Sequence, residues 1–415
     1  MRTSRNLILV LLAGFVITSG ITGMRTLREL HAGRSIYLKS DNLRMEDVLK
    51  TIGTTPDSRL YIYGSYLLYQ HRLFSISRDG FRVNFCERPL QSIVFLPFIP
   101  SGKYMPILTI LVLTILFPLS LILLAHTLSR GRLDKRISLA VLIAILFGSF
   151  YATRLLLDGW VSILLALWIA LTIKRRTLLS TGTAFLLSVL RPEFVILFII
   201  LLIINEGKSI RLITAGAAII SISAYIFVSK ECGDQSHFFE WTIQAYGQNV
   251  AGEFDRSGFE EKVKRCIIEG RKEISEDIHP RKIERDCFRE TTLEVLEKEN
   301  PLKLFIIATG NIVKNAFDLA FNFTINNRLN RKATFPIVFL LTIIYDLIFI
   351  SSSIKLWRSK KYRFLFALWM MLLLIYSAYY PFGLANPSRW KTVLFPVEIS
   401  IIALSTAVEQ EKKGP

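Results

Sequence analysis

The stretch Ser188-Val189-Leu190-Arg191-Pro192-Glu193 separates two apolar runs, 178–190 and 194–204, and each run alone is too short to cross a bilayer. Proline lacks a backbone donor, so it kinks or ends a helix. Two arrangements are therefore open. Either the runs form one kinked span, or they are two short helices that reverse direction at Arg191. The choice fixes the side of the membrane on which every later segment lies.

Eight further apolar runs accompany this break, at 7–22, 104–128, 137–152, 160–173, 212–228, 335–354, 364–380 and 392–404. The hydrocarbon core of a bilayer is crossed by about 20 helical residues, fewer where polar ends snorkel. The chain is 52% hydrophobic with a mean hydropathy of +0.42, and its apolar residues are bunched into these runs. The pattern predicts an all-α polytopic membrane protein.

Basic residues cluster in the short connections at 130–136, 174–176, 208–211 and 355–363. Connections rich in Lys and Arg stay in the cytoplasm. All four fit one topology only if the chain reverses at Arg191. That topology has about ten transmembrane helices and both termini inside. The same clustering accounts for the net charge of +18, so no nucleic-acid partner is predicted.

Two large extracytoplasmic segments follow from this topology. The predicted parts are a first transmembrane helix at 1–22, an outer loop at 23–103, helices two to seven at 104–228, an outer segment with interfacial helices at 229–334, the last helices at 335–406, and a cytoplasmic tail at 407–415. Within the second outer segment, 281–300 is charged and predicted helical, and Asn300-Pro301 begins another helix. The apolar stretch 302–323 is predicted to lie in the outer interface, because a crossing there would move the basic cluster at 355–363 outside.

All four cysteines fall in the two outer segments: Cys86, Cys232, Cys266 and Cys287. An oxidising compartment would allow two disulfides, with three possible pairings. Four free thiols remain the alternative.

Three motifs, in their order along the chain, carry a family resemblance. The first is Asp57-Ser58-Arg59-Leu60-Tyr61 followed by Glu87-Arg88-Pro89-Leu90, and the second is the Arg-Pro turn at 191–192. The third is Glu297–Pro301 followed by Pro387-Ser388-Arg389-Trp390. This order resembles the GT-C glycosyltransferases, in particular the protein O-mannosyltransferase and lipid A aminoarabinose transferase branch.

The resemblance implies inverting transfer of a sugar from a polyprenyl-phosphate donor to a glycan, lipid or protein acceptor outside. In the family, an acidic residue of the first outer loop is the base, which nominates Asp57. That residue usually lies closer to the first span, so Asp41 remains a rival. Thr55-Pro56-Asp57-Ser58 is also ordinary turn chemistry. The resemblance leaves a divalent metal ion open.

Arg191 is the candidate for holding the donor phosphate, because a guanidinium makes charge-assisted hydrogen bonds to phosphate. The alternatives are an ion pair with Glu193 or a snorkelling anchor. Asp158, at the outer end of its span, is a candidate for contacting a metal or the acceptor. Otherwise it is an exposed loop carboxylate.

Arg389 and Lys391 flank Trp390 at the outer entrance of the last span. They suit a phosphate or a lipid headgroup, or else an aromatic-belt anchor. Tyr61 and Arg88 complete the candidates from the first motif, and Glu193 and Trp390 are further site candidates. Inside the last spans, Asp346 and Glu398 are functional candidates or helix-pairing groups.

Three other functions stay open. A transporter or flippase for lipid-linked saccharides predicts matching broken helices, and only one Arg-Pro break is found. An O-antigen polymerase or ligase usually lacks a large outer loop ahead of span two. A non-catalytic scaffold with this fold is the third. The expected location is a multi-pass protein of the prokaryotic plasma membrane, in contact with membrane lipids, with its active site facing outward.

Overall fold

A computed structural model describes residues 2–38, 45–70, 89–231, 256–272, 280–306, 309–310, 331–379 and 387–413. Over these ranges the chain is helical and has no β-strand beyond one isolated bridge, between Ser35 and Thr51. It divides into two compact units. Unit 1 comprises 1–235, 333–369 and 388–415, and unit 2 comprises 236–332 and 370–387.

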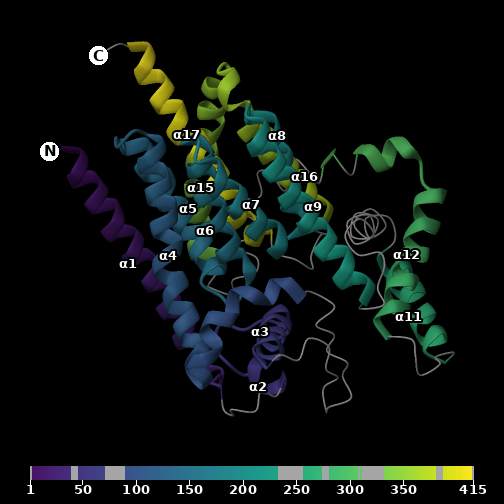
Figure 1. Ribbon diagram of the computed structural model, residues 1–415. Helices are drawn as coiled ribbons and strands as arrows, with labels where there is room; N and C mark the ends of the chain where they lie inside the picture. Colours follow the sequence, from purple (N-terminus) through teal and green to yellow (C-terminus); the bar gives the residue numbers. More distant parts are fainter. Residues whose placement is uncertain are drawn as a thin grey trace. The chain divides into compact units, whose positions relative to one another are not determined.

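Over its described residues, each of the ten predicted apolar runs is helical (Figure 1). The elements of unit 1 are α1 (Arg2–His31), α2 (Met45–Leu49), α3 (Pro56–Tyr69), η2 (Pro89–Tyr104), α4 (Met105–Leu128), α5 (Lys135–Ala152), α6 (Leu157–Ile173), α7 (Thr177–Leu190), η3 (Pro192–Val195), α8 (Ile196–Ile204), α9 (Lys208–Glu231), α15 (Arg331–Trp357), η4 (Lys360–Tyr362) and α17 (Pro387–Lys413). Helix α16 (Arg363–Tyr379) runs from unit 1 into unit 2. The all-helical class is confirmed.

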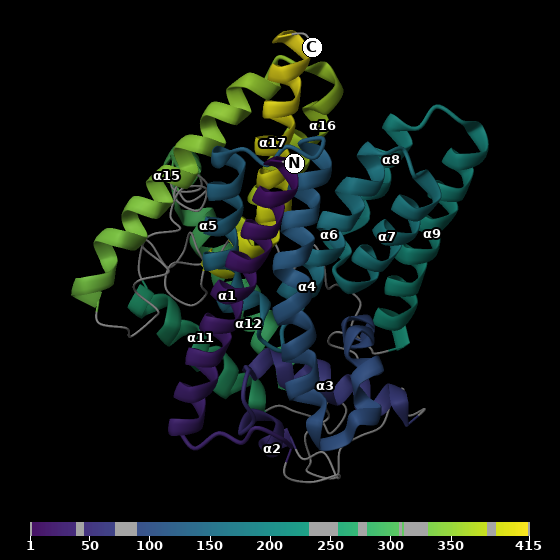
Figure 2. The same ribbon diagram turned by 90° about the vertical axis from the view of Figure 1, so that its left-hand side faces the viewer.

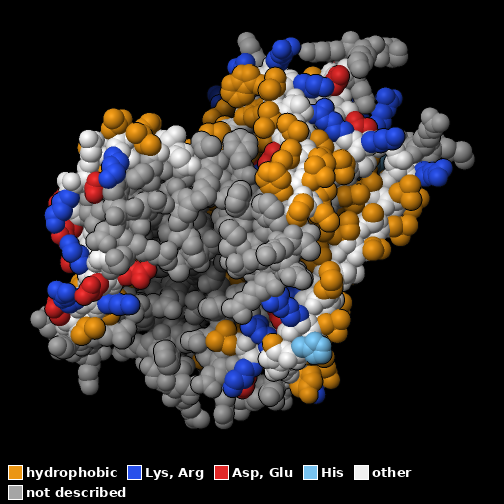
Figure 3. Space-filling view, turned by 180° about the vertical axis from the view of Figure 1, so that it is seen from behind, with side chains coloured by type: hydrophobic (Ala, Val, Ile, Leu, Met, Phe, Trp, Pro, Cys, Tyr) orange, Lys and Arg blue, Asp and Glu red, His pale blue; other side chains and the backbone are white. Residues whose placement is uncertain are grey.

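Five helices among the described residues are long and apolar enough to cross a membrane: Arg5–His31, Gln91–Leu128, Lys135–Ala152, Pro336–Trp357 and Lys391–Glu409. Four shorter apolar helices accompany them, at Leu157–Ile173, Thr177–Leu190, Pro192–Ile204 and Arg363–Tyr376. Large apolar side chains lie exposed along α1, α9 and α15. Figure 3 shows such side chains spread over the visible flank of unit 1, as expected of a lipid-facing surface.

Two helix boundaries differ from the sequence prediction. Helix α1 continues past Thr22 to His31, and the second candidate span begins at Gln91 in η2 rather than at Tyr104. Hydropathy alone missed both. The α1 extension is amphipathic and carries charges, while Pro97 and Pro100 interrupt the apolar pattern of η2.

Both chain termini and several predicted cytoplasmic connections meet at one end of unit 1 (Figure 2). Asn6 Nδ2 donates to the Leu133 carbonyl at 3.1 Å, and Arg130 pairs with Glu411. The end of α15 is tied to the end of α17 by Lys355 and Glu409 at 2.8 Å. The α4–α5 and α15–α16 connections therefore lie at the same end of unit 1 as the termini, as the Lys- and Arg-rich sequences of these connections predict.

The chain reverses at Arg191. Helices α7 and α9 run parallel, because Thr181 meets Thr214 at 3.2 Å and Ser188, one heptad later, meets Ser221 at 2.7 Å. A short connection at 205–207 joins α8 to α9, so α8 runs opposite to both. One kinked span would place α7 and α8 in the same direction. The contacts fit two helices with a turn between them.

At the opposite end of unit 1, α2, α3 and η2 form a small helical layer (Figure 1). Thr55 caps α3 in a capping box with Ser58, and Pro56 occupies the first turn. Ser65 Oγ donates to the Ser92 carbonyl at 2.6 Å, and the Tyr61 ring stacks on Phe95 with centroids 6.3 Å apart. The segment predicted as the first outer loop is therefore folded where it is described.

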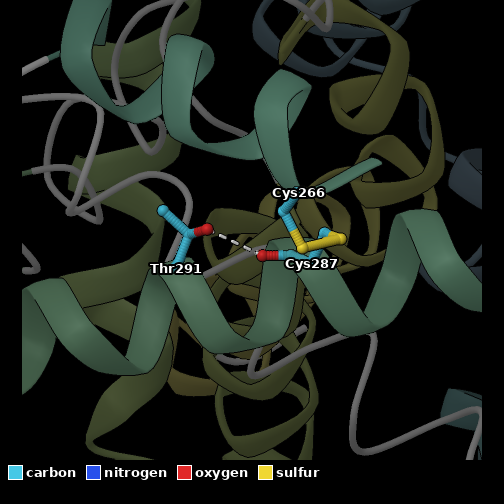
Figure 4. The surroundings of a disulfide bond; sticks show 3 residues. All are labelled: Cys266, Cys287 and Thr291. Atoms are coloured by element: carbon cyan, nitrogen blue, oxygen red, sulfur yellow. Dashed lines mark hydrogen bonds between the residues drawn. A yellow bond between two sulfur atoms is a disulfide. The ribbon is translucent and has the colours of Figure 1, made fainter. Parts of the chain in front are cut away.

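Unit 2 contains α11 (Arg256–Lys272) and α12 (Pro280–Lys298), which a Cys266–Cys287 disulfide joins. Figure 4 shows this bond, with Thr291 Oγ1 donating to the Cys287 carbonyl at 2.8 Å. The predicted helix at 281–300 is confirmed. The next helix begins after Asn300, whose side chain accepts from the Leu302 amide. Cys86, Cys232 and most of 302–323 lie outside the described residues.

Candidate functional site

A buried ion pair occupies the reversal between α7 and η3. The α7 helix ends because Arg191 is extended (φ −147°, ψ 112°) and Pro192 follows it. Arg191 Nη2 lies 2.6 Å from Asp158 Oδ1, and Nη1 lies 3.5 Å from Glu193 Oε1. The side chains are 6%, 0% and 7% exposed, respectively. The guanidinium thus lies between two carboxylates, the nearer of which comes from another helix.

Asp158 is held in place by the tight start of α6. It lies in the first turn of that helix, after the extended residue Leu156. A Cβ atom on Gly159 would overlap the carbonyl oxygen of Ala152, so only glycine allows this approach. The interpretation of Asp158 as an exposed loop carboxylate is wrong, because the side chain is fully buried.

The first turn of α3 is fastened to the same loop. Ser58 Oγ donates to the Leu155 carbonyl at 2.5 Å, and the Leu155 amide donates to the Gly53 carbonyl at 3.0 Å. Asp57 precedes Ser58 in α3, although its side chain lies outside the described part of the chain. Through Ser58, the residue after Asp57, the first turn of α3 is thus bonded to Leu155, three residues before Asp158 in the sequence.

Arg25, in the last two turns of α1, hydrogen-bonds to the segment between α5 and α6. Its guanidinium donates to Thr153 Oγ1 at 3.0 Å and to the Thr153 carbonyl at 2.6 Å. The neighbouring Glu29 accepts from the Gly53 amide at 2.5 Å. Neither residue is a candidate from the sequence, because the apolar run predicts that the first helix ends at Thr22. A charged amphipathic continuation beyond an apolar run is the signal that would have found them.

A second buried polar cluster joins α15, α16 and α17 around Glu398. This carboxylate accepts from Lys391 Nζ at 2.6 Å, Tyr345 OH at 2.9 Å and Trp369 Nε1 at 3.0 Å. Lys391 is 4% exposed and Glu398 is fully buried. Lys391 is therefore no interfacial anchor. Glu398 links helices, one of the two roles expected of it.

The other predicted residues are placed less completely. Arg389 and Trp390 lie in the first turn of α17, but their side chains are not among those described. Tyr61 is buried in α3. Asp41 and Arg88 lie outside the described residues.

The fit of a divalent metal can be tested on the carboxylates. Among the described residues, no group of three or more His, Cys, Asp or Glu side chains is assembled. Asp158 and Glu193 instead surround the guanidinium of Arg191, which supplies the local positive charge. The described residues therefore do not form a metal site.

Comparison with known proteins identifies no relative: no family model, no curated protein and no solved structure matches this chain.

Proposed function

We propose that this chain is an integral membrane glycosyltransferase that moves a sugar from a polyprenyl-phosphate donor to an extracytoplasmic acceptor. The observation that supports it is the corner of unit 1 where the first turn of α3, the start of α6 and the α7–η3 reversal meet. Arg191 supplies a buried cation there, and Asp57, the candidate base, belongs to the first turn of α3, which is hydrogen-bonded to the segment before α6. A cation and a base are the two groups that such a transfer requires.

The proposed reaction is a single displacement. The acceptor hydroxyl attacks the anomeric carbon, and its proton passes to the Asp57 carboxylate. The bond from the anomeric carbon to the phosphate oxygen breaks, and the lipid phosphate leaves with the electron pair. Attack opposite the leaving group inverts the anomeric centre. A well-placed general base contributes about 10²–10⁴ in rate.

Arg191 would stabilise the departing phosphate. A guanidinium has five N–H donors and stays protonated, and it makes strong, charge-assisted hydrogen bonds to phosphate. Burial strengthens each of those bonds, because the surroundings have a low dielectric constant. Asp158 would then orient the guanidinium before the donor arrives, which is the preorganisation that lowers the barrier for charge developing on an oxygen.

The proposed orientation has about ten spans, both termini in the cytoplasm and the corner facing outward. It is supported by the meeting of the termini with the connections at 130–136 and 355–363 at one end of unit 1. The Cys266–Cys287 disulfide supports an oxidising location for unit 2. The short connections favour a prokaryotic plasma membrane, with the lipid donor entering from the surrounding bilayer.

The test is release of labelled sugar from a panel of polyprenyl-phosphate sugars by the purified protein in nanodiscs. Wild type is compared with Asp57→Asn and Asp41→Asn, and Glu411→Gln, at the other end of unit 1, is the control. Loss of release in one Asn variant, with donor binding retained, supports the proposal and identifies the base. Donor binding without release by wild type favours a transporter. Neither binding nor release favours the scaffold.

A further inference from the structure

The Lys391 side chain points into the interior of unit 1. It lies in the second turn of α17, where a lysine near the end of a span normally extends its ammonium toward the headgroups. Here Nζ instead reaches Glu398, seven residues further along the same helix, at 2.6 Å. It lies 5.9 Å from the centre of the Tyr345 ring and 6.0 Å from that of Phe349.

The buried ammonium of Lys391 needs a partner, because an ion inside a span is costly unless it is paired and hydrogen-bonded. Glu398 meets that condition, because donors from Lys391, Tyr345 and Trp369 occupy both of its oxygens. The pair therefore links the start of α17 to α15 and α16 from inside the unit.

The start of α17 lies at the depth of Asp158. A Cβ atom on Gly148 of α5 would lie 3.3 Å from Phe395 Cδ2, which places these two residues side by side. Helix α17 runs opposite to α5, since the Arg130–Glu411 pair joins the end of α17 to the connection before α5. Lys391 precedes Phe395 by four residues, and Ala152 follows Gly148 by four. Because the helices are antiparallel, Lys391 and Ala152 both lie about 6 Å from the Gly148–Phe395 contact, toward the end of unit 1 that contains α3.

Ala152 is in turn the residue against which Gly159 packs. The start of α17, 388–391, and the buried Asp158–Arg191 pair therefore occupy one level of unit 1. The start of α17 carries Arg389 and Trp390, the remaining candidates for donor recognition.

We propose that Glu398 is a positioning residue for the donor site. Through Lys391 it fixes the backbone at the start of α17, the segment to which Arg389, a candidate ligand of the donor phosphate, belongs. Lys391 is then a structural link and not itself a phosphate ligand. The inference rests on the proposed glycosyltransferase function for its substrate, but its geometric part is testable without transfer.

The experiment compares Glu398→Gln, Lys391→Met and the double variant in nanodiscs. Glu409→Gln, in the last turns of the same helix, is the matched control. If Glu398 acts through Lys391, each single variant raises the donor KM about tenfold with the acceptor KM unchanged. In the Lys391→Met background, Glu398→Gln then adds little. A lower donor KM in Glu398→Gln would overturn the proposal, because it would mean that Glu398 restrains a lysine that itself binds phosphate.

The second readout is hydrogen exchange of peptides covering 387–397, measured by mass spectrometry on the same samples. Faster exchange there in both single variants, with α4 and α5 unchanged, supports the positioning role even if no donor is turned over. Unchanged exchange overturns it. The double variant guards against simple misfolding, because removing both charges avoids leaving one of them buried and unpaired.

Discussion

Arg191 and Asp158 form a salt bridge of 2.6 Å although 33 residues separate them, and both side chains are buried. The bond joins the reversal after α7 to the first turn of α6. The reversal places a guanidinium inside unit 1, and the start of α6 buries a carboxylate beside it. Each group compensates the other.

Asp158→Asn should be more harmful than Glu193→Gln. Asparagine keeps a hydrogen-bonding oxygen but removes the charge nearest to Arg191, whereas Glu193 lies 3.5 Å away. Breaking a buried pair costs about 3–5 kcal/mol, and the remaining carboxylate places this case at the lower end. Thermal unfolding in detergent, followed by tryptophan fluorescence, compares the two. Equal midpoints would contradict the assignment of Asp158 as the principal partner.

Gly159→Ala should destabilise unit 1, because the new methyl group meets backbone and not a flexible side chain. Overpacking of this kind costs about 1–3 kcal/mol. The control is Gly182→Ala in α7, where no atom lies within 4 Å of the added Cβ. It should be neutral or slightly stabilising, since alanine favours helix. Similar unfolding midpoints for the two variants would show that α5 and α6 do not approach so closely.

Much of this fold could be predicted from the sequence. Apolar runs mark every helix of the membrane-like layer, and basic clusters identified the end where the termini lie. The sequence left open whether the chain kinks or reverses at Arg191-Pro192. The contacts Thr181–Thr214 and Ser188–Ser221 show that it reverses. Such contacts between helices cannot be predicted from the sequence around the break.

The site was predictable only in part. Asp158 and Arg191 were each singled out, but not as partners, because their pairing depends on how α6 and α7 pack. Ser58 is part of the first motif, but its contact with Leu155 could not be predicted, because a serine in a turn is ordinary. This bond joins the first motif, at the start of α3, to the segment before α6. Lys391 looked interfacial from its position, and only its burial shows that it points inward.

Removing the Cys266–Cys287 bond should destabilise α11 and α12. The two residues are 21 apart in sequence, and closing a loop of that length is worth about 3 kcal/mol in the chain-entropy description. Cys266→Ser and the Cys266→Ser/Cys287→Ser double variant should be equally affected. Proteolysis of 256–298 under non-reducing conditions measures this. Wild-type resistance that is unchanged by a reductant would contradict it.

Glu294 should make stability depend on pH in acid. Hydrogen bonds from Lys298 and then Lys262 lower the pKa of this exposed carboxyl from 4.5 to about 2. A lowered pKa means that the contribution is present above about pH 4.5 and lost as pH falls toward 2. Glu294→Gln should therefore lower the midpoint slightly at pH 7 and not at pH 2. Because both partners are exposed, 1 M salt should remove the difference. A difference that persists in salt would point to some other role for Glu294.

The reversal at Arg191 makes a direct prediction about sidedness. Glu206, in the connection between α8 and α9, should face the cytoplasm, and His31, at the end of α1, should face outward. Single cysteines at these positions are introduced with Cys86 and Cys232 replaced by serine and the disulfide left intact. An impermeant thiol reagent applied to whole cells should label His31→Cys, and should label Glu206→Cys only after the membrane is opened. Labelling of Glu206→Cys in intact cells would restore the single kinked span, because that arrangement places 205–211 outside.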